Sequence, residues 1–176
     1  MELRCYPYRF VQRVDEFDSA NTFLKHKLLY SFRSPKTHMW YWVWVEVYDH
    51  DFYTVKFHLK NHRHSPHKYN LMTHLYEARP VINTCIAIMQ SIGELNPRSS
   101  FGFIGSNMEN ETEVNTKRFR VYRRFMATYF NEEHFVHMFN VKKSSYVMLR
   151  RSELEANPSM LNELDERFQQ LYDYFD

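Results

Sequence analysis

Glycine and cysteine are both scarce in this chain of 176 residues, which contains three glycines and two cysteines. Cys5 and Cys85 are too few for a disulfide framework, and together with nine methionines they favour a reducing compartment. The sequence contains no phosphate-binding loop, no dinucleotide-binding glycine pattern and no nucleophile elbow. It therefore excludes these common enzyme signatures, and it assigns no catalytic residue and no cofactor.

Long hydrophobic runs are absent as well. The longest nearly apolar run, residues 81–92, is interrupted by four polar side chains and falls short of the ~20 residues that span a bilayer. The first residues, Met1 to Arg4, carry no basic-then-apolar signal pattern. We therefore expect a cytoplasmic protein that makes no contact with a membrane.

Aromatic residues, in contrast, are abundant at 18% of the chain, whereas the hydrophobic fraction of 44% is ordinary for a soluble globular protein. No linker or internal repeat divides the sequence, so residues 1–176 are expected to form a single domain. The formal net charge is +2, but residues 152–176 hold seven acidic residues and one arginine. A basic body thus ends in an acidic segment, predicted to be a helix, and the body favours an anionic partner.

The order of the predicted elements defines the fold class. Apolar alternation and β-branched runs predict strands at 5–11, 28–32, 39–48, 52–60, 100–106, 135–139 and 146–149. Helical spacing predicts helices at 81–92 and 114–130 and a last helix after Asn157-Pro158. This order favours an α+β fold, in which an antiparallel sheet of about five to seven strands has two or three helices packed on one face.

The register of the hairpin formed by segments 39–48 and 52–60 follows from the side-chain pattern. A loop of three residues, 49–51, places Tyr48 opposite Phe52 and gathers the valines of both strands on one apolar face. A loop of two residues would instead place Val43 opposite Lys56. Because a slip of one residue turns every side chain to the other face, the three-residue loop is predicted.

The opposite face of this hairpin carries tryptophans beside cations. The predicted pairs are Trp44 with Lys56, Trp42 with His58, and Trp40 with Lys60. An exposed sheet face of this composition is typical of a platform on which bases stack, and the candidate nucleic-acid contacts are Trp42, Trp44, Lys56, His58 and Lys60. Two alternatives stay open, because the indoles could form core beneath a helix or make cross-strand cation–π pairs with the lysines.

The predicted helix at 114–130 is strongly basic. Lys117, Arg120 and Arg124 recur at helical spacing on one stripe and are flanked by Arg123. Such a stripe can follow phosphates, so these four residues are also candidate nucleic-acid contacts. The alternative is that this basic face pairs with the acidic C-terminal helix.

Two further clusters are considered as metal sites. Five histidines lie between His58 and His74, but no carboxylate lies among them, so no metal is assigned and a basic, pH-sensitive loop is favoured. Three alternating acids, Glu109, Glu111 and Glu113, together with Glu132 and Glu133, could serve a metal-dependent nuclease, although solvated acidic loops are far commoner. Whether the histidine cluster binds metal stays open.

The segment Phe101-Gly-Phe-Ile-Gly leads through an acidic loop to Thr116-Lys117-Arg118 and, four residues further on, Tyr122. This strand ending in glycine, followed by a Thr-Lys-Arg-x-x-x-Tyr helix, resembles families of small prokaryotic proteins from Bacteroidetes-like genomes that carry no assigned activity. The resemblance covers about half of the chain. It implies a small α+β fold and a link to mobile-element or defence loci, and it supplies no catalytic residues.

These observations predict a non-catalytic binding module for an anionic partner, foremost nucleic acid, in a mobile-element or defence context. One alternative is a protein-interaction subunit, such as an antitoxin-like component or a homodimer. Its interface would be the aromatic sheet face, since tryptophan, tyrosine and arginine dominate interface hot spots. A second alternative is a divergent metal-dependent nuclease.

Overall fold

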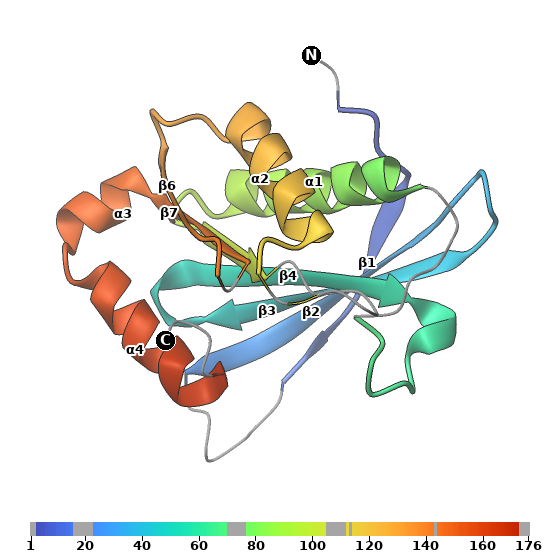
Figure 1. Ribbon diagram of the computed structural model, residues 1–176, viewed down its shortest axis with the longest axis horizontal. Coiled ribbons are helices and arrows are strands. Elements are labelled where there is room, and N and C mark those ends of the chain that lie inside the picture. Colours follow the sequence, from blue (N-terminus) through green and yellow to red (C-terminus); the bar gives the residue numbers. More distant parts are fainter. Residues whose placement is uncertain are drawn as a thin grey trace.

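In the computed structural model, seven strands form one sheet in the order β1-β2-β3-β4-β5-β7-β6. Figure 1 shows helices on both sides of this sheet. The structure describes residues 3–15, 23–69, 77–104, 112, 114–142 and 144–172. The strands are β1 (Tyr8–Val14), β2 (Leu24–Arg33), β3 (Trp40–Tyr48), β4 (Phe52–Leu59), β5 (Ser100–Ile104), β6 (Phe135–Asn140) and β7 (Ser145–Arg150). The helices are α1 (Ala78–Leu95), α2 (Lys117–Tyr129), α3 (Arg151–Ala156) and α4 (Met160–Tyr172). The predicted α+β class and strand number are therefore confirmed.

One strand pair departs from the antiparallel pattern. β5 runs parallel to the first residues of β4, with Phe52 beside Ser100 and Thr54 beside Gly102. α1 lies between these strands in the sequence and makes the crossover connection that a parallel pair requires. Of the helices in the described part of the chain, none is long and apolar enough to cross a membrane.

The register predicted for the hairpin of β3 and β4 is confirmed. Tyr48 lies opposite Phe52, Trp44 opposite Lys56, and Trp42 opposite His58. The three loop residues form a 3-10 turn, Asp49–Asp51, in which two residues adopt positive φ, 63° at His50 and 52° at Asp51. The burial of one face, rather than a glycine in the turn, therefore selects this register.

The apolar face of the hairpin is the centre of the main core. Val43 and Val45 are fully buried and belong to one cluster with side chains of α1 and α2. From α1 this cluster receives Ile86, and from α2 it receives Phe119, both fully buried. α1 and α2 lie together on this side of the sheet in Figure 1, so two helices cover one face, as predicted.

The C-terminal helix packs on the other face of the sheet. Tyr48 and Phe52, whose side chains alternate with the core valines, form a second buried cluster with Met160 and Leu164 of α4. In Figure 1, α4 lies near the end of β3 and β4 at which their connecting turn lies, and far from the turn Lys60–His62 that follows β4. The rest of this face, toward Trp40, is not covered by α1, α2 or α4.

Several element boundaries differ from the sequence-based expectations. β1 begins at Tyr8 rather than at residue 5, because the backbone N–H of Tyr6 donates to Thr84 Oγ1 of α1 at 2.9 Å instead of to a strand. α1 continues past Gly93 and ends at Leu95, where Asn96 precedes a proline and cannot remain helical. The short helix α3 is not predicted from the sequence.

Candidate functional site

The N-terminus of α2 is fixed to the turn between β6 and β7. Thr116 caps the helix, because its Oγ1 accepts from the N–H of Phe119 at 3.1 Å. The Thr116 N–H donates to Ser144 Oγ at 2.9 Å, and the Asn115 N–H donates to the Val141 carbonyl at 2.8 Å. These contacts, with the buried Phe119 and Met126, set which side of α2 faces solvent.

The solvent-facing side of α2 carries all four predicted cations, Lys117, Arg120, Arg123 and Arg124, and each of them is exposed. Among the residues that the structure describes, the three arginines of this set make no ion pair, and α2 itself contains no acidic residue. We call these four cations together with Phe139 the α2 basic surface.

The acidic C-terminal segment does not neutralise this surface within the described residues. Glu153 of α3 pairs with Arg98 at 3.1 Å, and Glu163 of α4 pairs with His50 Nε2 at 2.8 Å. Because α4 packs on the opposite face of the sheet, the alternative in which the basic helix pairs with the acidic helix is not seen here.

Arg123 lies over an aromatic ring on the edge strand. Its guanidinium carbon lies 3.8 Å from the ring centroid of Phe139 on β6, and that side chain is 48% exposed. The ring of Phe139 is in turn stacked on Tyr146, with centroids 6.2 Å apart and planes 13° apart. A contact between a guanidinium and a ring uses the face of the ring and not a hydrogen-bond acceptor, so the N–H donors of the exposed Arg123 remain available to a phosphate.

The tryptophans lie on the face of the sheet opposite α1 and α2. Trp40 is 41% exposed, whereas Trp42 and Trp44 are half-buried and contact each other edge to face at 6.2 Å. Residues close to these indoles complete what we call the tryptophan surface, made of Trp40, Trp42, Trp44, Lys56, Lys60, Lys68 and Tyr69. The alternative in which the indoles are core beneath a helix does not hold for Trp40.

Lys56 is engaged by a buried carboxylate. Its Nζ lies 2.7 Å from Oε1 of Glu46, a residue that is only 6% exposed, and the hydroxyl of Tyr48 donates to Oε2 at 3.0 Å. Burial acts to raise the pKa of Glu46, but the charge and hydrogen bond of Lys56 outweigh it and hold that pKa below its ordinary value. Lys56 therefore brings little net charge to the tryptophan surface.

His58 lies beneath the tryptophan surface rather than on it. The residue is 3% exposed, and its Nδ1 lies 2.7 Å from the Leu59 carbonyl, which can only accept a hydrogen bond. Burial lowers the pKa of the imidazole, the hydrogen bond to the Leu59 carbonyl opposes this shift, and the charge of the nearby Lys68 adds to it. The net lowering of the pKa favours the neutral ring. His58 supports the ring of Tyr69, whose centroid is 5.4 Å away, and it offers no charge to a ligand.

Lys60, Lys68 and Tyr69 form the outer part of the tryptophan surface. Nζ of Lys60 lies 5.9 Å from the Trp42 ring centroid, and Nζ of Lys68 lies 5.3 Å from that of Tyr69. The cross-strand cation–π alternative is thus seen for Lys60 and Trp42. The sequence does not identify Lys68 and Tyr69 as part of this surface, because they lie in an irregular segment where side-chain periodicity gives no direction. The one local feature that points to them is an aromatic residue next to a lysine.

The two candidate surfaces do not form one patch. Strand alternation directs Val43 and Val45 toward α1 and α2, and it therefore directs the tryptophans to the other side of the sheet. One contact links the two sides. Arg118 of α2 lies over the Phe57 ring at 5.2 Å and also donates to the Tyr69 carbonyl.

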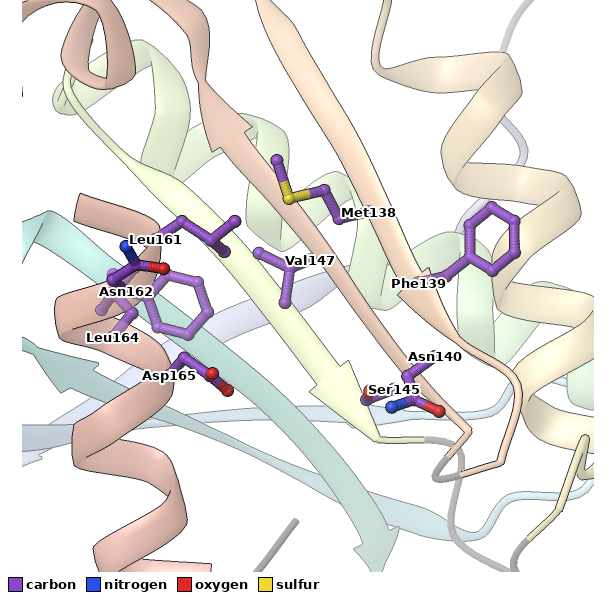
Figure 2. Close-up of a pocket in the computed structure, with 10 residues that line it drawn as sticks. Met138, Phe139, Asn140, Ser145, Val147, Leu161, Asn162, Leu164 and Asp165 are labelled. Atoms are coloured by element: carbon purple, nitrogen blue, oxygen red, sulfur yellow. The ribbon is translucent and has the colours of Figure 1, made fainter. Parts of the chain in front are cut away.

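A pocket of about 260 Å³ lies between α4 and the hairpin of β6 and β7 (Figure 2). Its apolar wall includes Met138, Val147 and Leu161, and its polar side includes Asn162 and Asp165. Burial and the neighbouring Glu166 raise the pKa of Asp165 above its ordinary value. The polar and apolar sides of this pocket could hold a small amphipathic group.

The remaining predicted groups fall partly outside the described residues. Glu109, Glu111, Glu113 and His74 lie there, so the nuclease alternative and the full histidine cluster are not tested. Among the described residues, no three histidine, cysteine, aspartate or glutamate side chains are grouped so that they could hold a metal ion.

The fold and the two surfaces define a small α+β protein with a basic helix on one side of its sheet and an aromatic face on the other. No protein family, curated protein or solved structure matches the chain. The function proposed below therefore rests on the chemistry of these two surfaces.

Proposed function

We propose that this protein is a non-catalytic nucleic-acid-binding module and that the α2 basic surface binds the phosphate backbone. The observation that carries the proposal is the set of exposed arginines, Arg120, Arg123 and Arg124, that make no ion pair among the described residues. An arginine without a carboxylate partner keeps its planar set of N–H donors available for phosphate oxygens.

The spacing of the cations supports contact with a repeating anion. Lys117, Arg120 and Arg124 span seven helical positions, which is about 10 Å at a rise of about 1.5 Å per residue. Several phosphates of one backbone can therefore meet this stripe at once. Arg123 adds a fourth contact, and because its side chain is already held over Phe139, less conformational entropy is lost on binding.

The direct test is titration of fluorescently labelled RNA and DNA at several salt concentrations. Four phosphate contacts predict that log K falls with log salt at a slope of about −3 on a single strand. The double variant Arg120→Gln/Arg124→Gln removes two contacts, so the slope should fall to about −1.5 and the affinity should drop at low salt.

A matched control is Arg13→Gln on β1, at the opposite edge of the sheet from β6 and β7. Arg13 is 57% exposed and, among the described residues, pairs locally with Asp15 at 2.8 Å, so this variant should bind like the parent protein. Absence of salt-sensitive binding in the parent protein, or equal loss in the control, would refute the proposal.

The protein-interaction alternative makes a different prediction. It is favoured by the exposure of Trp40, because a large exposed aromatic group is typical of an interface, and among the described elements α1, α2 and α4 leave this part of the sheet face open. In that case light scattering should show a stable dimer, and Trp42→Ala should dissociate it. A monomer in the parent protein excludes self-association through this face.

A further inference from the structure

We propose that the tryptophan surface binds unpaired bases, so that the ligand of this protein is a single-stranded nucleic acid. This inference rests on the proposed function and gives it a substrate class. The α2 basic surface meets only phosphates, which duplexes and single strands both present. A surface of exposed rings can distinguish the two, because the bases of a duplex are already stacked on one another.

Trp40 is the residue that a base would contact first. Its side chain is 41% exposed, whereas Trp42 and Trp44 are half-buried and held edge to face against each other. The indoles of Trp42 and Trp44 therefore form a rigid base for this surface, which we call the tryptophan floor. Trp40 is the indole whose ring is most accessible to a ligand. A rigid aromatic group loses little conformational entropy when a base stacks on it.

Tyr69 provides a second ring at the same end of the sheet. It lies against His58, which in turn contacts Trp42 with centroids 6.0 Å apart. This chain of ring contacts joins Tyr69 to the tryptophan floor. Because Arg118 of α2 donates to the Tyr69 carbonyl, the same residue is also connected to the helix that carries the α2 basic surface.

Lysines lie beside the rings of this surface. Lys60 is exposed beside Trp42, and Lys68 lies over Tyr69. Rings with neighbouring cations match the bases and phosphates of a single strand. Lysine is depleted in the cores of protein–protein interfaces, so this composition favours a polyanion over a protein partner.

The chain offers a direct readout, because its only three tryptophans all belong to this surface. Intrinsic fluorescence is measured while an unlabelled oligonucleotide of about 12 thymidines is added, a length within the usual site size. A duplex of equal length is added in a parallel titration. We expect saturable quenching with the single strand, weaker quenching with the duplex, and tighter binding of the single strand.

Variants then distinguish the contribution of the tryptophan surface to binding from that of the α2 basic surface. Binding is measured by the fluorescence anisotropy of labelled oligonucleotides. Trp40→Ala should weaken single-strand binding about tenfold and leave duplex binding unchanged, whereas Trp40→Phe should retain most of the affinity. Phe10→Ala is the matched control, because Phe10 is 54% exposed and lies on the opposite face of the sheet. If Trp40→Ala does not fold, Lys60→Gln/Lys68→Gln replaces it and should show the same selective loss.

Each other outcome overturns the inference. Equal affinity for both ligands without a fluorescence change leaves the proposed function intact and removes the role of the tryptophan surface. Binding of neither ligand refutes the proposed function itself. A dimer that dissociates on Trp40→Ala assigns this face to a second copy of the chain instead.

Discussion

Replacing Lys56 by methionine should destabilise the protein and weaken the pH dependence that Glu46 contributes. The methionine keeps an apolar stem of similar length but leaves the carboxylate of Glu46, 6% exposed, without its cation at 2.7 Å. Two unit charges about 4 Å apart attract by about 4 kcal/mol at an effective dielectric constant of about 20. Lys56 is one-third exposed and Tyr48 still donates to Glu46, so we expect a loss of about 2–3 kcal/mol near neutral pH.

The sign of the pH effect follows from the two pKa values of this carboxyl. In the parent protein the pKa of Glu46 is held below its ordinary value of 4.5, so its contribution is present above pH 4.5 and is lost as pH falls through the native pKa. Without Lys56, only the charge of Lys27 and the hydrogen bond of Tyr48 still oppose burial, so the native pKa of Glu46 should rise. The Lys56→Met variant should therefore lose less stability from this group than the parent protein loses as pH falls through the native pKa.

Urea unfolding followed by tryptophan fluorescence, between about pH 4 and pH 8, measures both effects. Lys60→Met is the matched control, since Lys60 is exposed directly after the same strand, β4, and has no buried acid beside it among the described residues. This variant should change the free energy of unfolding by less than about 0.5 kcal/mol. Equal stability of Lys56→Met and the parent protein at neutral pH, or parallel pH profiles, would show that the ion pair does not hold Glu46 ionised.

Two further predictions concern the sheet and the core. Gly102→Ala should lower the free energy of unfolding by about 1–3 kcal/mol in urea denaturation, because the added Cβ would lie 2.4 Å from Cζ of the buried Phe52. An unchanged midpoint would contradict this close approach. Burial raises the pKa of the Cys85 thiol to about 12, whereas Cys5 is exposed, so a thiol reagent at about pH 8 should label one cysteine in the native protein and two in urea. Rapid labelling of both in the native state would show that the α1 core opens readily.

The sequence predicts those features whose signal is periodic. Alternation excludes the two-residue loop of the β3 and β4 hairpin, because a slip of one residue would take Val43 and Val45 to the side opposite Val55 and Phe57. Helical spacing likewise identifies the buried side of α2 through Phe119 and Met126, and hence the exposed side that carries its cations. In both cases a local sequence pattern identifies the buried side chains, and the buried side of the element then determines which side chains face solvent.

The sequence does not predict how these elements combine. Local periodicity says which side of α2 is apolar, but not which face of the sheet that side covers. The separation of the α2 basic surface from the tryptophan surface therefore emerges only from the fold. The burial of His58 has a similar origin, since strand alternation assigns it to the same side as Trp42, and Tyr69 then covers it from an irregular segment.

The position of α4 makes the two ends of this sheet face differ in charge. α4 covers the end of this face at Tyr48 and Phe52, whereas Trp40 lies eight residues from Tyr48 along β3, about 26 Å at a rise of about 3.3 Å per residue. Fields of exposed charges decay over about 8 Å at physiological salt, so the acids of α4 do not cancel Lys60 and Lys68 at the far end. A polyanion that reaches this face is thus repelled at one end and attracted at the other, and the attractive end is the one at which the free indole lies.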